Sequence, residues 1–248
     1  MKKSIFLLFA IVSVAGMIAT SGCDRPETYT THGALNGHNW VDLGLPSGLL
    51  WATCNVGAST PEEYGDYFAW GETTPKETYN WSTYRYCNGG EGWNTLTKYC
   101  NNADYGNNGF TDELTTLEAS DDAATANWGS AWRMPTYDEL NELKNNCTVT
   151  WTTQNGVNGR LFTGPNGNSI FLPAAGGRDG SDLRLAGSSG YYWSSSLYMA
   201  DFLVNVLAPY PGPGSAWYLY IYSGIYNVYD LYRYYGLSVR PVCVSSQN

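Results

Sequence analysis

The stretch "NWGSAWRMPTYDELNELKNNC", residues 127–147, carries the clearest local signals in the chain. Thr136 and Glu139 have the spacing of a capping box, in which each side chain satisfies a free backbone N–H of the first helical turn. The two leucines that follow are three residues apart, so they lie on one face of a helix. The stretch therefore predicts a helix over 136–146 with one buried side.

Two further helices are predicted from similar signals. Ser120 is a cap residue followed by acids and an alanine-rich run that ends at a glycine, which predicts a helix over 121–128. Thr60 precedes a proline, Glu63 closes a second capping box, and Gly65 follows, which predicts a short helix between them.

The remaining regular secondary structure is expected to consist of strands. Short runs with alternation or β-rich composition, bounded by Gly, Pro or Asn, predict them. These runs are "GLLWATCNV" (48–56), "RLFTG" (160–164), "SIFLPA" (169–174), "YYWSSSL" (191–197), "AWYLYIY" (216–222) and "GLSVRPV" (236–242). The predicted class is α+β, with short mixed or antiparallel strands, two main helices and extensive loops. No linker interrupts the chain, so we expect one domain over 37–248.

Composition limits the range of partners. The chain has 248 residues, a formal net charge of −9 and only 13 Lys and Arg. Nucleic acids and anionic membrane surfaces attract clustered basic residues, so neither is an expected partner. Abundant Gly, Asn and Tyr with few charges favour an extracellular domain rich in turns.

The N-terminus predicts export. Lys2 and Lys3 precede an apolar run that is too short to span a membrane, which is the layout of a signal peptide over 1–22. Small residues before Cys23 resemble a bacterial lipobox, so Cys23 is the predicted lipidation site and 23–36 a polar tether. Ordinary cleavage that leaves Cys23 as a thiol is the alternative. We expect an exported protein held by lipid at the outer membrane or cell surface.

The other cysteines are Cys54, Cys87, Cys100, Cys147 and Cys243. Export to an oxidising compartment favours disulfides, and because five is odd at least one thiol is left over. Cys87 and Cys100 flank a Gly-rich loop and are the first pair we would predict; the remaining connectivity stays open. No CxxC motif occurs and the chain has two histidines, which does not favour a zinc site.

Signatures of catalysis are missing from the sequence. GxSxG, P-loop, GxGxxG and HExxH motifs do not occur. His32 and His38 lie near the N-terminus and are expected at the surface. Carboxylate pairs such as Glu62 with Glu72, or Asp112 with Glu118, would suit glycoside hydrolysis, but acids at helix starts are already explained by capping. We expect binding without turnover.

No cofactor is expected, with one alternative. The loop "NNADYGNNGFTDELTTLE", residues 101–118, concentrates oxygen donors among glycines, as a calcium site does. Taken as an EF-hand from Asp104, it places Thr115 where the bidentate Glu belongs. A solvated polar loop is therefore the preferred interpretation, and calcium remains the alternative.

Seven blocks in order carry a family resemblance: "WATCNVGA", "YGDYFAWGE", "NWGSAWRMPTYDELNEL", "TWTTQNGVNG", "SIFLPAAGGRDG", "GYYWSSS" and "SVRPV". From about Asn39 to Val242 the chain resembles the Fibrobacter succinogenes major paralogous domain, which is common in lipoproteins of gut bacteria. The resemblance implies a C-type lectin-like fold related to formylglycine-generating enzymes and to the variable proteins of diversity-generating retroelements. It implies pairing of "GLLWATC" with "GLSVRPV".

Two features of those relatives have no counterpart in the sequence. The copper-binding cysteine pair of formylglycine-generating enzymes is not matched. The Glu-Pro-Asn, Gln-Pro-Asp and Trp-Asn-Asp motifs of calcium-dependent lectins do not occur either. Neither formylglycine chemistry nor calcium-dependent sugar binding is therefore implied.

The segment "AWYLYIYSGIYNVYDLYRYYGLSVRPV", residues 216–242, is unusually rich in tyrosine. Alternation along a strand sends Trp217 and the aliphatic residues after it to one face, and Tyr218, Tyr220 and Tyr222 to the other. We expect the first face to pack and the second to point outward. The family pattern supplies the fixed frame, which continues through Val228 and "SVRPV".

The residue types between the frame positions resemble a retroelement-diversified region. Adenine randomisation of asparagine codons yields Tyr, Asp, Ser, Gly and others, but never Lys, Glu, Gln, Met or Trp. Lys, Glu and Gln are absent from 155–246, whereas Met199 is an exception within 198–237 unless it belongs to the frame. An undiversified binding surface and purely structural tyrosines are the alternatives.

The resulting hypothesis is a surface lipoprotein, of adhesin or receptor type, that displays a diversified ligand-binding face. Its ligand would be a protein or glycan at a cell or phage surface. A structural or pilus-type subunit is the main alternative, followed by a carbohydrate-active or formylglycine-generating-like enzyme. The predicted binding residues are Tyr198, Asp201, Tyr218, Tyr220, Tyr222, Tyr226, Asn227, Tyr229, Asp230, Tyr232, Tyr234 and Tyr235.

Overall fold

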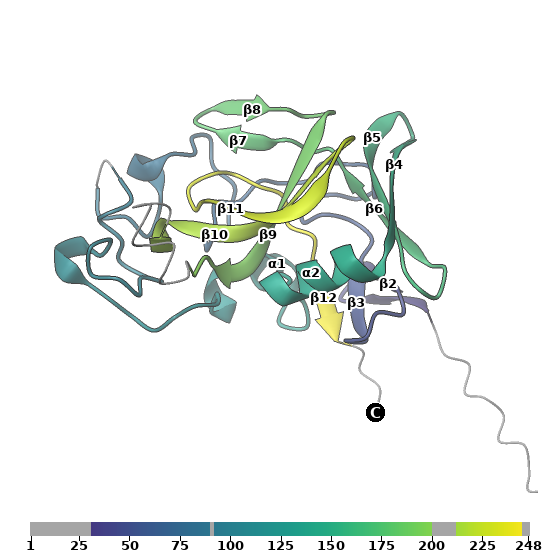
Figure 1. The fold of residues 1–248 in the computed structure, drawn as a ribbon, viewed down its shortest axis with the longest axis horizontal. Coiled ribbons are helices and arrows are strands. Elements are labelled where there is room, and N and C mark those ends of the chain that lie inside the picture. Colours follow the sequence, from purple (N-terminus) through teal and green to yellow (C-terminus); the bar gives the residue numbers. More distant parts are fainter. Residues whose placement is uncertain (1–30, 90–91, 200–211, 245–248) are drawn as a thin grey trace, which may run out of the picture. The chain divides into compact units, whose positions relative to one another are not determined.

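Short antiparallel strands provide most of the regular structure (Figure 1). The computed structural model describes residues 31–89, 92–199 and 212–244. The strands are β1 (His32–Leu35), β2 (His38–Asp42), β3 (Leu49–Ala52), β4 (Thr148–Gln154), β5 (Val157–Thr163), β6 (Ser169–Pro173), β7 (Gly177–Asp179), β8 (Asp182–Arg184), β9 (Ser189–Leu197), β10 (Ser215–Tyr222), β11 (Tyr226–Tyr232) and β12 (Val242–Val244). The helices are α1 (Ala123–Trp128) and α2 (Tyr137–Asn146), with single 3-10 turns η1 (Trp81–Thr83), η2 (Asn107–Gly109), η3 (Ala119–Asp121) and η4 (Gly212–Gly214). The predicted α+β class is confirmed.

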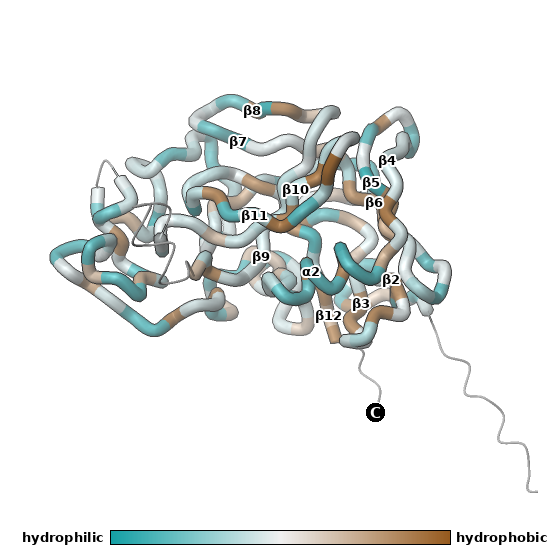
Figure 2. The backbone as a smooth tube through the Cα atoms, viewed as in Figure 1, coloured by the Kyte–Doolittle hydropathy of each residue, from teal (hydrophilic) through white to brown (hydrophobic). Residues whose placement is uncertain are grey.

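The first and last strands of the described chain meet in one sheet with the order β1-β2-β3-β12. Trp51 of β3 lies opposite Val242 of β12, so the predicted pairing of the terminal strands is confirmed. In Figure 2, β3 and β12 have the brown colour of hydrophobic residues. The predicted strand over 236–242 is too long, because this segment changes partners: Leu237 pairs with Phe68, and strand β12 starts only at Val242.

Strand β1 modifies the predicted domain boundary. Residues 32–35, which the sequence assigns to the tether, pair with β2 in register His32 to Val41. Their side chains alternate between exposed and half-buried. The folded unit therefore includes the last part of the predicted tether.

Helix α2 forms as predicted. Thr136 accepts a hydrogen bond from the Glu139 N–H, and the Glu139 side chain accepts from Thr136, which completes the capping box. Leu140 and Leu143 are buried and pack with Leu219 of β10 in one hydrophobic cluster. Burying a leucine side chain contributes roughly 1.5–3 kcal/mol, so this face fixes α2 on the sheet.

The other two helix predictions need correction. The cap of α1 is Asp122 rather than Ser120, because the Asp122 carboxylate accepts from the N–H groups of both Thr125 (3.0 Å) and Met134 (2.8 Å). The helix predicted after Thr60 is a turn. The Glu63 carboxylate does reach back to Thr60 N–H (3.3 Å), but Gly65 has a φ of 70° and ends the segment before a first turn can propagate.

The predicted disulfide between Cys87 and Cys100 is wrong for the structure. All five cysteines of the described chain are free. The Cys87 Sγ lies 2.7 Å from Thr95 Oγ1, and the Cys100 Sγ donates to Asn102 O (3.2 Å). Each of these two thiols therefore contacts a polar atom of a nearby residue and not the other thiol.

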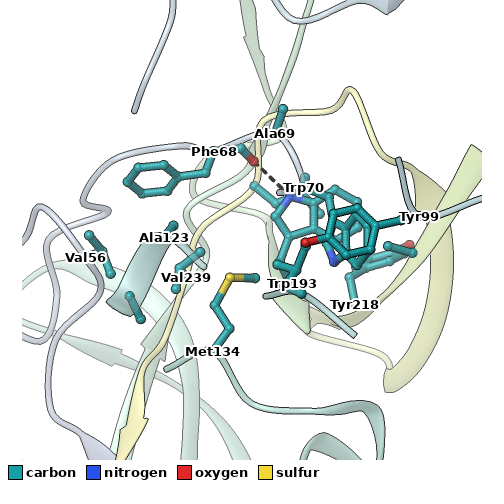
Figure 3. Packing of buried hydrophobic residues seen from close by; sticks show 14 of the residues in the cluster. Val56, Phe68, Ala69, Trp70, Tyr99, Ala123, Met134, Trp193, Tyr218 and Val239 are labelled. Carbon is teal, nitrogen blue, oxygen red and sulfur yellow. Dashed lines mark hydrogen bonds between the residues drawn. The ribbon is translucent and has the colours of Figure 1, made fainter. Parts of the chain in front are cut away.

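Several aromatic rings of the core donate from their polar atoms to backbone carbonyl oxygens. The indole N–H of Trp193 donates to Phe68 O (2.8 Å; Figure 3), and that of Trp70 donates to Ser194 O (2.8 Å). Two buried arginines also donate to backbone carbonyl oxygens. Arg233 donates to Lys98 O and Tyr99 O.

Arg240 is fully buried and has four hydrogen bonds. It donates to the carbonyl oxygens of Ala52, Thr53 and Phe171, and to the side-chain oxygen of Asn55. Burial lowers its pKa from the usual value. Because these acceptors surround the guanidinium, the segment around Arg240 is held in place with no carboxylate partner among the described residues.

No helix within residues 31–89, 92–199 and 212–244 is long and apolar enough to cross a membrane.

Candidate functional site

The sheet β11-β10-β9 carries the candidate site on one face. Register places Tyr218 opposite Tyr229 of β11 and Trp193 of β9, while Tyr220 lies opposite Tyr191. Because side chains that face each other across strands share a face, these rings gather on one side of the sheet. We call Tyr191, Tyr218, Tyr220, Tyr222 and Tyr229 the tyrosine face.

Rings of the tyrosine face contact one another in a continuous array. Tyr220 is central: its ring centroid lies 5.0 Å from Tyr191, 5.5 Å from Tyr222 and 6.3 Å from Tyr229. Tyr191 is stacked at 5.7 Å on Tyr218. Aromatic pairs at these separations restrain each other, so the array is a preformed surface.

Exposure increases along this array. Tyr218 is 7% exposed, whereas Tyr222 and Tyr229 are 36% and 38% exposed. The predicted outward position of Tyr218 is therefore wrong, because Tyr191 and Trp193 of the neighbouring strand cover its ring. The outward prediction is confirmed for Tyr222, whereas Tyr220 is half-buried. Tyr229, a predicted binding residue, is exposed as well.

Two phenols of this face, those of Tyr191 and Tyr218, have a raised pKa. Burial, and then the nearby Tyr220, raise the pKa of Tyr191 to about 12. Burial also raises the pKa of Tyr218. These two phenols can therefore offer a hydrogen-bond donor, an acceptor and ring surface, but no phenolate charge at neutral pH.

A second group of predicted residues surrounds Trp81 of η1. The Trp81 ring lies 5.7 Å from Tyr232 and 5.1 Å from Tyr234, and Tyr234 stacks on Tyr235 at 4.4 Å. We call Trp81, Tyr232, Tyr234 and Tyr235 the Trp81 cluster. Its three tyrosines lie at the end of β11 or directly after it, so the chain connects this cluster to the tyrosine face.

An apolar pocket of about 230 Å³ connects these two groups. Tyr191 of the tyrosine face and Tyr235 of the Trp81 cluster both line it, with Leu231 and Leu237. The β7–β8 hairpin, seen above the sheet in Figure 1, closes the other side. The pocket is lined by Gly177, Asp179, Arg184, Leu185, Tyr191, Leu231, Tyr235 and Leu237.

Leu185 is an unusual residue in this lining. It is 56% exposed and has a φ of 59°, a left-handed conformation that is rare for a leucine and costs roughly 1–2 kcal/mol. Its carbonyl accepts from Ser188 N–H (3.1 Å), Ser189 N–H (2.9 Å) and the Ser188 hydroxyl (2.9 Å). These bonds hold an apolar side chain at the edge of the pocket.

Several predicted residues lie away from the tyrosine face. Tyr226 and Asp230 are opposite Ile221 and Trp217, so they share the face that packs toward α2. Tyr226 stacks under the Arg160 guanidinium at 4.6 Å, and burial raises the pKa of Asp230. The expectation that these two side chains belong to the outward set is wrong.

The last two predicted positions differ from each other. Asn227 lies opposite Tyr220 on the edge strand β11, so it shares the side of the tyrosine face, and its side-chain oxygen accepts from Lys144 of α2 (3.0 Å). The Tyr198 ring lies 4.8 Å from Trp217. Asp201 and Cys23 lie outside the described residues. The structure thus divides the predicted set into the tyrosine face, the Trp81 cluster and residues on the α2 side.

The sequence predictions omit Tyr191 and the β7–β8 hairpin. Gly180 and Ser181 form the two-residue loop between β7 and β8, where Asp179 pairs with Asp182. Gly-Ser between two short strands is a known hairpin signal, so the hairpin could have been predicted. The approach of this hairpin to Tyr191 depends on tertiary packing and has no local signal.

Residues weighed for catalysis have structural partners. His38 stacks on Trp128 at 3.7 Å. Glu62 accepts from Asn155 and Gln154, and Glu72 accepts from Lys76 and from Arg85 N–H.

The loop weighed for calcium uses its central acid internally. Asp112 accepts from the N–H groups of Tyr99, Cys100 and Leu114. Within the described chain no group of three or more His, Cys, Asp and Glu side chains is arranged to hold a metal ion.

Comparison with protein-family models, with curated proteins and with solved structures gave no match.

Proposed function

We propose that the protein is a surface-anchored binding protein with a C-type lectin-like domain, and that the tyrosine face around the apolar pocket contacts its ligand. The observation that carries the proposal is the continuity of the contacting tyrosine rings with a 230 Å³ apolar pocket. Ligand sites are typically concave and apolar with a few polar groups, and this region fits that description.

The chemistry of the face suits recognition of a protein or glycan. Tyrosine gives a large amphipathic contact area with little loss of side-chain entropy, which is why antibody binding loops use it. The strained, exposed Leu185 supports the same assignment, because conformational strain is concentrated at functional sites. Binding alone is proposed, with no turnover.

Surface anchoring and diversification are further parts of the proposal. They rest on the lipobox-like sequence before Cys23, on the family resemblance and on the restricted residue types of the C-terminal segment. Exposed Tyr222 and Tyr229 suit substitution, since neither ring is part of the core.

A DNA test addresses diversification. We expect a near-copy of the codons for residues 190–242 downstream, differing only at adenines, beside a reverse transcriptase gene. Intact flanking DNA without such a copy would rule out active local diversification.

A binding test addresses the face. The protein is screened on glycan arrays and on panels of bacterial and phage surface proteins. Then Tyr222→Ser/Tyr229→Ser is compared with Phe110→Ser, whose side chain is similarly exposed at 37%. Central aromatic contacts contribute about 1–2 kcal/mol or more each, so the double variant should weaken binding tenfold or more.

The control variant Phe110→Ser should bind as the unmodified protein does. Equal affinity of the double variant would disprove the assignment of the face. If the double variant instead abolished ordered self-assembly measured by sedimentation, the structural-subunit alternative would replace the proposal.

A further inference from the structure

Strand β7 separates the apolar pocket from a second pocket of about 470 Å³. Gly177 and Asp179 line the apolar pocket, whereas Arg178 between them lines the second one. This follows from strand alternation, which sends neighbouring side chains to opposite sides. The second pocket has a volume within the range of small-molecule sites.

Arg178 is the only charged group of this pocket that is both half-buried and without an opposite charge within 4 Å in the described chain. Its guanidinium lies over the Tyr67 ring at 5.2 Å. Its side-chain hydrogen bond to another described residue is a long one, to Ser181 O (3.4 Å). The backbone of Arg178 is held in place, because Arg178 and Gly236 exchange two backbone hydrogen bonds (2.8 and 3.0 Å). A guanidinium with free donors is suited to a carboxylate.

The tyrosine hydroxyls and the lysine of the pocket already have partners. The Tyr67 hydroxyl donates to Ala175 O (2.5 Å), and the Tyr79 hydroxyl donates to Tyr67 O (2.6 Å). Lys76 pairs with Glu72 (2.8 Å) and also donates to Thr83 O (2.9 Å). Arg178 therefore provides the available cationic donors.

Two exposed acids, Asp66 and Glu77, complete the lining. Neither has an ion-pair partner in the described chain. They repel a dianion such as phosphate, but they attract an ammonium group. Counting ion pairs among the described residues only, this pocket has one unpaired cation and two unpaired anions.

We propose that this pocket binds a small zwitterion, namely an amino acid or short peptide, with its carboxylate on Arg178 and its ammonium group toward Asp66 and Glu77. The site is separate from the tyrosine face. Tyr67 and Tyr79 supply ring surface for the part of the ligand between its two charges.

Diglycine is the probe, measured by titration calorimetry and by NMR shifts. N-acetylglycine keeps the carboxylate but lacks the ammonium group, and glycinamide has the reverse. Diglycine should bind saturably and more tightly than either. Loss of a fork-like pairing in Arg178→Met should weaken it about tenfold or more, and Arg178→Lys should retain part of the affinity.

Arg85→Met is the matched control, because Arg85 also lies over a tyrosine ring (5.4 Å from Tyr86) but does not line the pocket. It should leave diglycine affinity unchanged. Asp66→Asn/Glu77→Gln, both at exposed positions, should weaken diglycine and strengthen N-acetylglycine.

Three results would overturn the proposal: no saturable binding of diglycine, unchanged affinity in folded Arg178→Met, or N-acetylglycine binding as tightly as diglycine.

Discussion

The thiol of Cys243 is buried, and burial raises its pKa to about 11. Burial raises the pKa of Cys147 to about 11 as well, and it raises that of Cys100. Thiols react as thiolates, so at neutral pH these groups are poor nucleophiles. Free cysteines can therefore persist in this fold even where disulfides are favoured.

We expect a reductant to leave the melting temperature unchanged. A disulfide closing a loop of the size between Cys87 and Cys100 would contribute about 3 kcal/mol, roughly 6–12 °C of Tm in a chain of this length. Differential scanning calorimetry with and without reductant measures this directly. Alkylation after unfolding in the absence of reductant should label Cys54, Cys87, Cys100, Cys147 and Cys243. A drop in Tm on reduction, or an unlabelled pair, would contradict the expectation.

At the scale of elements, one arginine holds the β10–β11 hairpin. Arg160 of β5 is buried and donates to Tyr222 O through Nε (3.1 Å) and Nη2 (2.7 Å). It also donates to Ser223 O (3.3 Å) and lies against the Tyr226 ring. The hairpin that carries Tyr222 and Tyr229 is thus tied to the separate sheet β4-β5-β6.

Arg160→Met should destabilise the protein and loosen this turn. Hydrogen bonds to a charged group contribute about 1.5–3 kcal/mol, part of which is recovered when the charge no longer has to be buried. We expect a loss of about 1–3 kcal/mol in urea unfolding. Hydrogen exchange should become faster at the Tyr222 N–H, which donates to Ile225 O (2.9 Å).

The exposed Arg85→Met is the control and should change stability by less than about 0.5 kcal/mol. Equal unfolding free energies for Arg160→Met and the unmodified protein would show that the turn is held by its own strands.

At the scale of the whole molecule, the sequence predicts those elements whose formation depends on residues that are close together in the chain. Helix α2 could be predicted from its capping box and leucine spacing, and β10 from its alternation. The cap of α1 was missed because Asp122 is also bonded to Met134, a residue outside the helix. The β3–β12 pairing was found through family resemblance, since residues so distant in sequence carry no local sign of contact.

The candidate site was predictable only in part for a similar reason. The β10–β11 register, in which Ile221 lies opposite Tyr226, determines on which face of the sheet Tyr226 and Asp230 lie. A shift by one residue would exchange the two faces of β11, and single-strand alternation does not determine this register. The burial of Tyr218 depends on the neighbouring strand β9, and the pocket depends on the β7–β8 hairpin.

The hydrogen bonds of the buried side chains favour backbone acceptors. Arg233 binds the carbonyl oxygens of Lys98 and Tyr99, and Arg240 those of Ala52, Thr53 and Phe171. Every amino acid has a carbonyl group, so these anchors survive when the residues that accept them are replaced. The frame can accordingly keep its geometry through sequence drift at those acceptor positions, provided that the backbone path is preserved.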